Sequence, residues 1–229
     1  MDFSKFEQTA GVIFKDKALL KQAFIHRSYI NENRSSELEH NERLEFLGDA
    51  VLELVITDFL YKKYKDMDEG ELTSLRSALV NADTCAEVAT KLGANDFLLL
   101  SKGESKDVGR ARQYILANTL ESVIGALYID QGFEEAQKFI YAHITPLTEE
   151  IVKSKAWIDS KSLFQEKAQE NLGTTPTYKT IRENGPDHDK EFVIGVFVGG
   201  EKLGEGEGKS KQDAEQEAAR DALKNKGWE

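Results

Sequence analysis

The hydrophobic pattern changes its period near residue 155, and this change restricts what the chain can fold into. Up to about residue 150, apolar residues recur at the three- and four-residue spacing typical of helices. After the segment VKSKAWIDS, a helical pattern is followed by runs that alternate apolar and polar residues, as half-buried strands do. The sequence therefore predicts two domains, an all-α domain over residues 1–155 and a small α+β domain over residues 156–229.

Five helices are predicted in the first domain, and no strand. They cover residues 16–30, 41–65, 69–92, 112–130 and 133–153, and Pro146 is expected to break or kink the last of them. The second domain is predicted to have the order αβββα. Its first helix, 161–173, ends at Gly173, its strands lie in TYKTIREN, EFVIGVFV and the segment from residue 201, and Ser210 caps its last helix.

The composition fits compact domains but speaks against a polyanionic partner. Hydrophobic residues make up 40% of the chain and charged residues 31%. The net charge is −11, and acidic residues outnumber basic ones 26 to 19 before residue 156 and 15 to 11 after it. A nucleic-acid partner would therefore require basic groups that gather locally.

Two further features of the sequence bear on where in the cell the protein is located. The single Cys85 excludes an internal disulfide and a cysteine-based zinc site, and it is expected to be a packed, inert thiol. The first residues lack a signal-peptide pattern, and no apolar run approaches the ~18 residues that a membrane span requires. A cytoplasmic protein is expected.

The segment HNERLEFLGDAVLELVI, residues 40–56, combines an apolar helix face with a stripe of acids. Glu42, Glu45, Asp49 and Glu53 fall on one side at helical spacing, opposite the Leu and Val residues. A solvated polar face would explain such a stripe. However, like charges three and four residues apart repel, and the stripe contains no Lys or Arg, so a bound cation is the alternative.

A second helix, RQYILANTLESVIGALYID, is apolar nearly all round and is therefore expected to be buried. Asn118 and Glu121 are its polar exceptions on one face, and Gly125 lies one turn further on, where another helix could approach closely. Packed against the first helix, these groups would add hard oxygen ligands to Glu45 and Asp49. The pattern suits Mg²⁺ or Mn²⁺, with satisfied structural acids as the open alternative.

These two helices resemble the signature helix and the second acidic motif of the ribonuclease III family. HRSYINE and DEGELTSLRSALVN are also similar to helices of that family, and the αβββα module is similar to its double-stranded-RNA-binding domain. The resemblance implies a homodimeric, Mg²⁺-dependent endoribonuclease, with Mn²⁺ as a possible substitute. It would cut double-stranded RNA to 5′-phosphate and 3′-hydroxyl ends with two-nucleotide 3′ overhangs, as in rRNA and mRNA precursor processing.

The resemblance also assigns roles in the first domain. It implies that Glu45, Asn118, Glu121 and Asp49 form the metal site, and that Asp49 and Glu121 are catalytic. Glu42 and Glu69 match outer acids linked to selection of the scissile bond. Phe46 resembles a residue that inserts into the partner subunit, although an ordinary core Phe remains an alternative.

Asn118 departs from the family pattern, which usually has a metal-binding Asp there. An amide oxygen can coordinate a metal but brings no negative charge. Asn118 is a tolerated ligand, or a weakening change that more Mg²⁺ or Mn²⁺ compensates, or the mark of an inactive form. In the last case the chain would bind duplex RNA without cutting it. An acidic interaction module without any RNA role would leave the second domain unexplained.

The resemblance places RNA contacts in both domains. In the first, Lys102, Lys106, Arg110 and Arg112 gather just before the second acidic helix, where phosphate contacts or a merely solvated loop would both fit. In the second, it implies minor-groove contacts from Gln165 and Glu166 and from the loop residues Gly185, Pro186, Asp187 and His188. Lys209 and Lys211 would meet phosphates, but Gln212 and Asp213 interrupt the usual basic run, so weaker and more salt-sensitive binding is expected.

Overall fold

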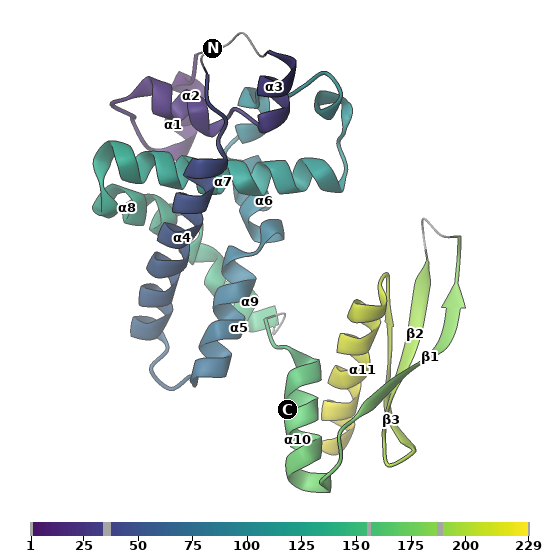
Figure 1. Cartoon of the computed structure of the whole chain (residues 1–229). Coiled ribbons are helices and arrows are strands. Elements are labelled where there is room, and N and C mark those ends of the chain that lie inside the picture. Colours follow the sequence, from purple (N-terminus) through teal and green to yellow (C-terminus); the bar gives the residue numbers. More distant parts are fainter. Residues whose placement is uncertain (1, 34–37, 155–156, 187–189, 229) are drawn as a thin grey trace. The chain divides into compact units, whose positions relative to one another are not determined.

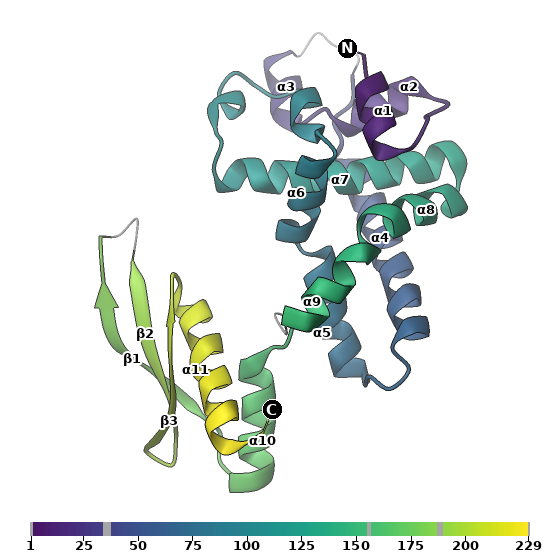
Figure 2. The same cartoon turned by 180° about the vertical axis from the view of Figure 1, so that it is seen from behind.

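The computed structural model describes residues 2–33, 38–154, 157–186 and 190–228. The chain divides into two compact units, residues 1–157 and 158–229 (Figures 1 and 2), two residues beyond the division expected from the sequence. The first unit is helical throughout, and the second combines a small sheet with two helices.

Helices α4 and α7 form the centre of the first unit. Both have 22 residues, and α7 crosses α4 in both views (Figures 1 and 2). The side chains of Leu52 and Ile56 on α4 and of Ile124 on α7 are fully buried. The α-helices of the unit are α1 (Ser4–Ala10), α2 (Lys17–Ala23), α3 (Arg27–Glu32), α4 (Glu42–Lys63), α5 (Glu69–Val80), α6 (Ala82–Lys91), α7 (Arg110–Gln131), α8 (Phe133–His143) and α9 (Thr148–Ser154), and its 3₁₀ turns are η1 (Ala94–Phe97), η2 (Glu104–Lys106) and η3 (Thr145–Leu147).

Two of the predicted helices are in fact pairs of helices. The predicted helix 16–30 breaks at residues 24–26, because the backbone of Ile25 forms a parallel bridge to Leu99 and the His26 N–H donates to the Leu99 carbonyl. The predicted helix 69–92 breaks at Asn81, whose extended backbone and side chain, accepting from the Thr84 N–H at 2.9 Å, start α6 afresh. Both breaks come from hydrogen bonds that periodicity does not reveal.

The ends of the first unit also differ from the sequence pattern. Helix α1 was not predicted, and it is held by Phe6, which is buried against other aromatic rings. The segment 133–153 divides into α8, η3 and α9, with Pro146 inside η3, as its fixed φ and missing N–H led us to expect. Among the described residues, no helix is long and apolar enough to cross a membrane.

The second unit has the predicted order αβββα. Helix α10 (Ser160–Leu172) precedes the strands β1 (Thr177–Asn184), β2 (Glu191–Val198) and β3 (Glu201–Gly208), which pair antiparallel in that order, and α11 (Lys211–Lys226) follows. The core contains Phe164, Val196 and Leu203 with alanines of α11. Gly173 ends α10 in the left-handed region, and the Ser210 hydroxyl accepts from the Asp213 N–H at 3.1 Å, so both predicted caps are confirmed.

Three glycines let β3 lie very close to α11. A Cβ at Gly204 would lie 2.6 Å from the Ala222 nitrogen, one at Gly206 2.5 Å from the Ala214 carbonyl oxygen, and one at Gly208 2.5 Å from the Ala214 nitrogen. These separations are too short for real Cβ atoms. The alternating glycines of β3, with the small residues of α11, therefore set the thickness of this unit.

Candidate active site

The first turn of α4 is held by Asn41, which is buried. Its side-chain amide donates to the Ala23 carbonyl at 3.1 Å, and its backbone N–H donates to the Ile25 carbonyl at 2.9 Å. Its own carbonyl accepts from the N–H of Glu45 at 2.9 Å. The helix that carries the acid stripe is therefore fixed at its start to α2 and the segment after it.

Two glycines let α4 and α7 cross with their backbones in contact. A Cβ at Gly48 would overlap the carbonyl oxygen of Glu121 and lie 2.8 Å from the Gly125 nitrogen. A Cβ at Gly125 would overlap the carbonyl oxygen of Leu44 and lie 3.0 Å from the Gly48 nitrogen. The close approach predicted for Gly125 is present, and Gly48 is its counterpart on α4. This contact determines the separation between the acids of the two helices.

Glu45 and Asp49 on α4 and Glu121 on α7 interact across this crossing. Burial and the charges of Asp49 and Glu45 raise the pKa of Glu121 to about 8. Burial, with the charges of Glu42 and Asp49, raises the pKa of Glu45, while a hydrogen bond from the Asn118 side chain lowers it in part. Burial and the charge of Glu53 raise the pKa of Asp49. Without a cation, these carboxylates are pushed towards their protonated forms.

The donor set fits a hard cation. Carboxylate and amide oxygens are the ligands that Mg²⁺ accepts, and a cation would offset the charges of Asp49 and Glu45, which act together with burial to raise the pKa of Glu121. Across the parts of the chain that the structure describes, no group of three or more His, Cys, Asp or Glu residues is drawn together tightly enough to hold an ion by itself. Mg²⁺ commonly keeps several waters and takes only one or two carboxylates, so the looser arrangement remains compatible with it.

The two outer acids, Glu42 and Glu69, lie far apart in the first unit. Glu42 lies at the start of α4, where Arg27 of α3 pairs with it at 3.2 Å and the His40 ring lies 3.8 Å away. Glu69 lies at the start of α5, beside Leu60 and Tyr61 near the opposite end of α4. From Glu42 to Leu60 is about 27 Å along a helix that rises 1.5 Å per residue. One copy of the chain therefore does not bring Glu69 to the other acids.

Phe46 points away from the core of the first unit. Its side chain is 81% exposed, which excludes the alternative of an ordinary core Phe. Leu54 and Tyr61 follow it along α4 at helical spacing and are exposed as well. Helix α4 thus has an apolar outer face beside its acid stripe.

The four basic residues in the loop before α7 and in its first turn differ in the contacts that hold them. Lys102 and Lys106 are exposed, and they form no ion pair within the described residues. Arg110 lies over the Tyr114 ring, 5.7 Å from its centroid, and donates to the Tyr114 hydroxyl at 3.3 Å. Arg112 instead donates to three acceptors of the protein, in the loop and in η1.

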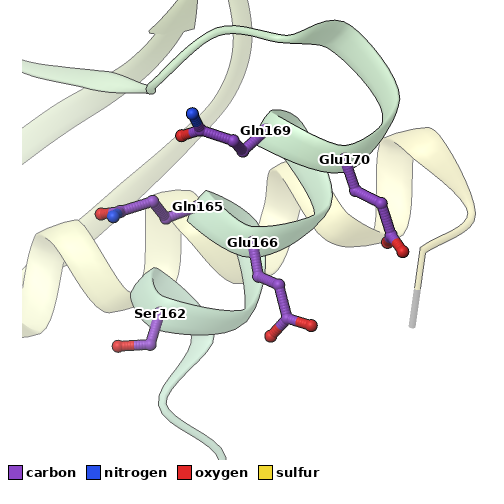
Figure 3. Close-up of a pocket in the computed structure, with 5 residues that line it drawn as sticks. All are labelled: Ser162, Gln165, Glu166, Gln169 and Glu170. Carbon is purple, nitrogen blue, oxygen red and sulfur yellow. The ribbon is translucent and has the colours of Figure 1, made fainter.

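In the second unit, the residues expected to contact RNA lie on the surface. Gln165 and Glu166 line a shallow hollow along the exposed side of α10, and Figure 3 shows Gln165 and Gln169 pointing to one side and Glu166 and Glu170 to another. Lys211 is exposed at the start of α11 and pairs with Glu183 at 3.1 Å. Lys209, two residues earlier, is exposed too. The expected contacts of Asp187 and His188 lie outside the described residues.

Sequence reasoning missed three residues that shape the site. Gly48 stands among apolar residues on the buried side of α4, and a glycine inside a long helix was a signal that could have been used. Asn41 and Arg27 gave no comparable signal, because their partners come from other helices.

Comparisons with known proteins find matches to both units of the chain. A family model described as ribonuclease-III-like matches residues 16–147, and one described as a double-stranded RNA binding motif matches residues 160–226. A relative named Ribonuclease 3 from Oceanobacillus iheyensis is 46% identical over 97% of both chains. One of the same name from Bacillus licheniformis is also 46% identical, over 96% of this chain and 88% of its own.

The first unit also resembles a solved structure. The nuclease domain of ribonuclease III from Campylobacter jejuni, described as structurally flexible in a region involved in dimer formation, is 40% identical to this chain with a TM-score of 0.58. The match covers 63% of this chain and 97% of that domain. The likeness thus concerns the helical unit that carries the acid cluster.

Proposed function

This chain belongs to the ribonuclease III family, and we propose that it is a Mg²⁺-dependent endonuclease that cuts both strands of an RNA duplex. The observation that carries the proposal is the carboxylate cluster at the glycine contact of α4 and α7, where burial and the charges of Asp49 and Glu45 raise the pKa of Glu121 to about 8. We further propose 5′-phosphate and 3′-hydroxyl products with two-nucleotide 3′ overhangs. The proposed substrates are rRNA and mRNA precursors in the cytoplasm.

Each member of the cluster has a distinct proposed role. Glu45, Asn118, Glu121 and Asp49 would hold the cation, and Mn²⁺ would be accepted in place of Mg²⁺. When bound, the ion supplies a lowered pKa for an attacking water and neutralises charge on the phosphoryl oxygens. Asp49 is the most exposed of the three carboxylates, and it would orient that water.

A homodimer explains two features that a single copy does not, the exposed apolar face of α4 and the position of Glu69 on α5. Phe46, Leu54 and Tyr61 form an exposed apolar face, which a second copy would cover. Glu69 lies beside Leu60, which is about 27 Å along α4 from Glu42. It would join Glu42 in selecting the scissile bond only when a second copy supplies it. The region of the Campylobacter jejuni nuclease domain that is involved in dimer formation supports this proposal.

RNA binding is proposed to use both units. Lys102, Lys106 and Arg110 supply positive charge in the loop before α7 and at the start of this helix, and this local charge offsets the net acidity of the chain. Gln165 and Glu166 on α10 would read a minor groove, and Lys209 and Lys211 would contact phosphates. The pairing of Lys211 with Glu183 reduces the charge available to phosphates, in line with weak, salt-sensitive binding by the second unit.

The decisive test is cleavage of a long RNA duplex of defined sequence by the purified protein, across titrations of Mg²⁺ and of Mn²⁺. We expect double-strand cuts that require the metal, with product ends mapped by sequencing and by sensitivity to phosphatase. Single-strand cuts, or cleavage that persists in excess chelator, would contradict the proposal.

Asn118 favours a second candidate function, that of a duplex-RNA-binding protein without nuclease activity. In this case the amide of Asn118 would satisfy Glu45 in place of a metal. Duplex binding without cleavage at any Mg²⁺ or Mn²⁺ concentration, together with cleavage by Asn118→Asp, would establish it. Cleavage by the unmodified chain would eliminate it.

A further inference from the structure

The Arg112 side chain forms hydrogen bonds with the loop between η1 and α7. The loop contains Lys102 and Lys106 and leads directly into Arg110, which are three of the basic residues proposed to contact the duplex. The contacts that hold this loop therefore affect RNA binding. The inference about them rests on the proposed function.

The Arg112 guanidinium uses three of its N–H groups on acceptors of the protein. Nε donates to the Asp107 carbonyl at 3.1 Å, Nη2 to the Glu104 carbonyl at 2.9 Å, and Nη1 to the Asn95 side-chain oxygen at 3.2 Å. Glu104 and Asp107 stand at the two ends of the η2 turn, and Asn95 belongs to η1. The planar fork of one arginine thus joins three segments.

The middle of the loop has little else to hold it. At its start, the Ser101 N–H donates to the Ser28 hydroxyl at 3.0 Å and the Lys102 N–H to the Glu32 carboxylate at 3.0 Å. From 103 to 108, every other hydrogen bond found among the described residues stays within the loop itself. Val108 is 90% exposed and gives no apolar anchor.

We propose that Arg112 is a positioning residue that orders residues 103–109, so that Lys106 and its neighbours meet the duplex in a preformed arrangement. Its own charge is already directed at protein oxygens, whereas Lys102 and Lys106 face solvent. A loop that is already ordered loses little conformational entropy when it binds the duplex. The binding free energy is therefore more favourable than for a loop that must become ordered on binding. Arg112 therefore acts on duplex binding through the loop.

The informative variant is Arg112→Lys, which keeps the charge and removes the fork. If Arg112 only contacted a phosphate, this change would leave the loop of the RNA-free protein as it is. A positioning role predicts that the loop amides of Ser105, Lys106 and Asp107 exchange hydrogen about tenfold faster in the RNA-free protein. It also predicts a roughly tenfold weaker Kd for a duplex. The cleavage rate at saturating duplex should stay near that of the unmodified protein, because the acid cluster is untouched.

Two further variants separate the positioning role from a general loss of structure. Asn95→Ala removes one anchor and no charge, and it should change exchange and Kd in the same direction by a smaller amount. Arg76→Lys is the matched control, because its guanidinium makes one hydrogen bond, to the Thr57 hydroxyl at 3.1 Å, and it should leave the loop amides unchanged. The Lys106→Ala change should raise Kd much less in the Arg112→Lys protein than in the unmodified protein. The reason is that the Lys106 contact with the duplex is already misplaced when Arg112 is absent.

Unchanged loop exchange and unchanged Kd in Arg112→Lys would overturn the proposal, as would an Asn95→Ala variant without any effect on exchange. If the unmodified protein bound no duplex, the proposed function would fail together with the RNA step of this inference. The exchange measurement, which contains no RNA, would still decide whether Arg112 orders the loop.

Discussion

The two units use the same device, backbone contact at glycine, for different purposes. In the first unit, Gly48 and Gly125 bring α4 and α7 together where acids of both helices interact. In the second unit, Gly206 and its neighbours bring β3 onto α11, while Gln165 and Lys211 lie on the exposed surface. The chemistry of the first unit is therefore built into its packing, whereas recognition by the second depends on separable surface groups.

Because of this difference, we expect the largest effect on cleavage and stability from a substitution at Gly48. Gly48→Ala forces a Cβ into the Glu121 backbone, so the helices must separate and the acid cluster is lost with them. We expect no measurable cleavage and a loss of about 3 kcal/mol in the free energy of unfolding of the first unit. Urea unfolding followed by circular dichroism measures the second quantity.

The matched control is Gly103→Ala, at a helical φ with only the Ser101 hydroxyl nearby, at 3.8 Å from a built Cβ. It should change stability by less than about 0.5 kcal/mol. A Gly48→Ala protein that folds and cuts normally would show that the glycine contact does not place the acids.

A smaller effect on cleavage is expected when the Glu121 carboxylate is replaced by an amide of the same size, because the packing of the two helices is then kept. Glu121→Gln should lower the cleavage rate by roughly 10²- to 10³-fold, the equivalent of a few kcal/mol of transition-state stabilisation. Single-turnover kinetics with saturating duplex would measure it. A rate within a factor of about two of the unmodified enzyme would remove Glu121 from the site.

The same residue predicts a pH dependence of stability. Its pKa is raised to about 8 in the folded state against an ordinary value of 4.5, so the folded chain holds a proton that the unfolded chain has released. The metal-free protein should therefore lose stability as the pH rises from about 4.5 to about 8, and Glu121→Gln should lack this loss. Urea unfolding in chelator across this pH range tests the sign, and a parallel pH profile of both proteins would contradict it.

Disrupting the glycine contact of the second unit should have a more limited consequence. Gly206→Ala places a Cβ 2.5 Å from the Ala214 carbonyl oxygen, so the αβββα unit should lose about 3 kcal/mol of stability. Because the acid cluster belongs to the other unit, the duplex KM should rise while kcat stays near its original value. Steady-state kinetics at low salt measures this split, and a kcat that falls as far as in Glu121→Gln would show that the units are not separable.

Asn118→Asp tests the charge of the cluster with a still smaller effect. The added carboxylate, beside Glu45, should lower the Mg²⁺ concentration for half-maximal cleavage by roughly tenfold. In chelator, the same variant should be less stable than the unmodified chain, because it adds repulsion without a cation. A Mg²⁺ titration that coincides with that of the unmodified protein would identify Asn118 as a fully adequate ligand.

The smallest effect belongs to a single exposed lysine. Lys102→Ala should weaken duplex binding a few-fold and reduce the slope of log Kd against log salt by about 0.9, the value for one phosphate contact. Binding titrations at several salt concentrations give this slope. An unchanged slope would mean that Lys102 belongs to a solvated loop, the alternative that the sequence leaves open.

Much of the architecture followed from local patterns. Periodicity separated the helical unit from the αβββα unit, and the caps at Gly173 and Ser210 were visible because capping depends on residues adjacent in sequence. The same patterns failed at Asn81 and Ile25, where a local cap and a bridge to Leu99 interrupt otherwise helical runs. Continuous apolar spacing does not show whether one helix or two carries it.

The sequence by itself determined which residues could form a site, because the acids of α4 and the polar pair on α7 stand out against apolar surroundings. Only the tertiary structure decided which of them meet. Gly48 and Gly125 set the distance between the helices, Arg27 of α3 pairs with Glu42, and the length of α4 keeps Glu69 apart. The physical reason is that charge interactions depend on distances in space, which the order of residues along the chain does not contain.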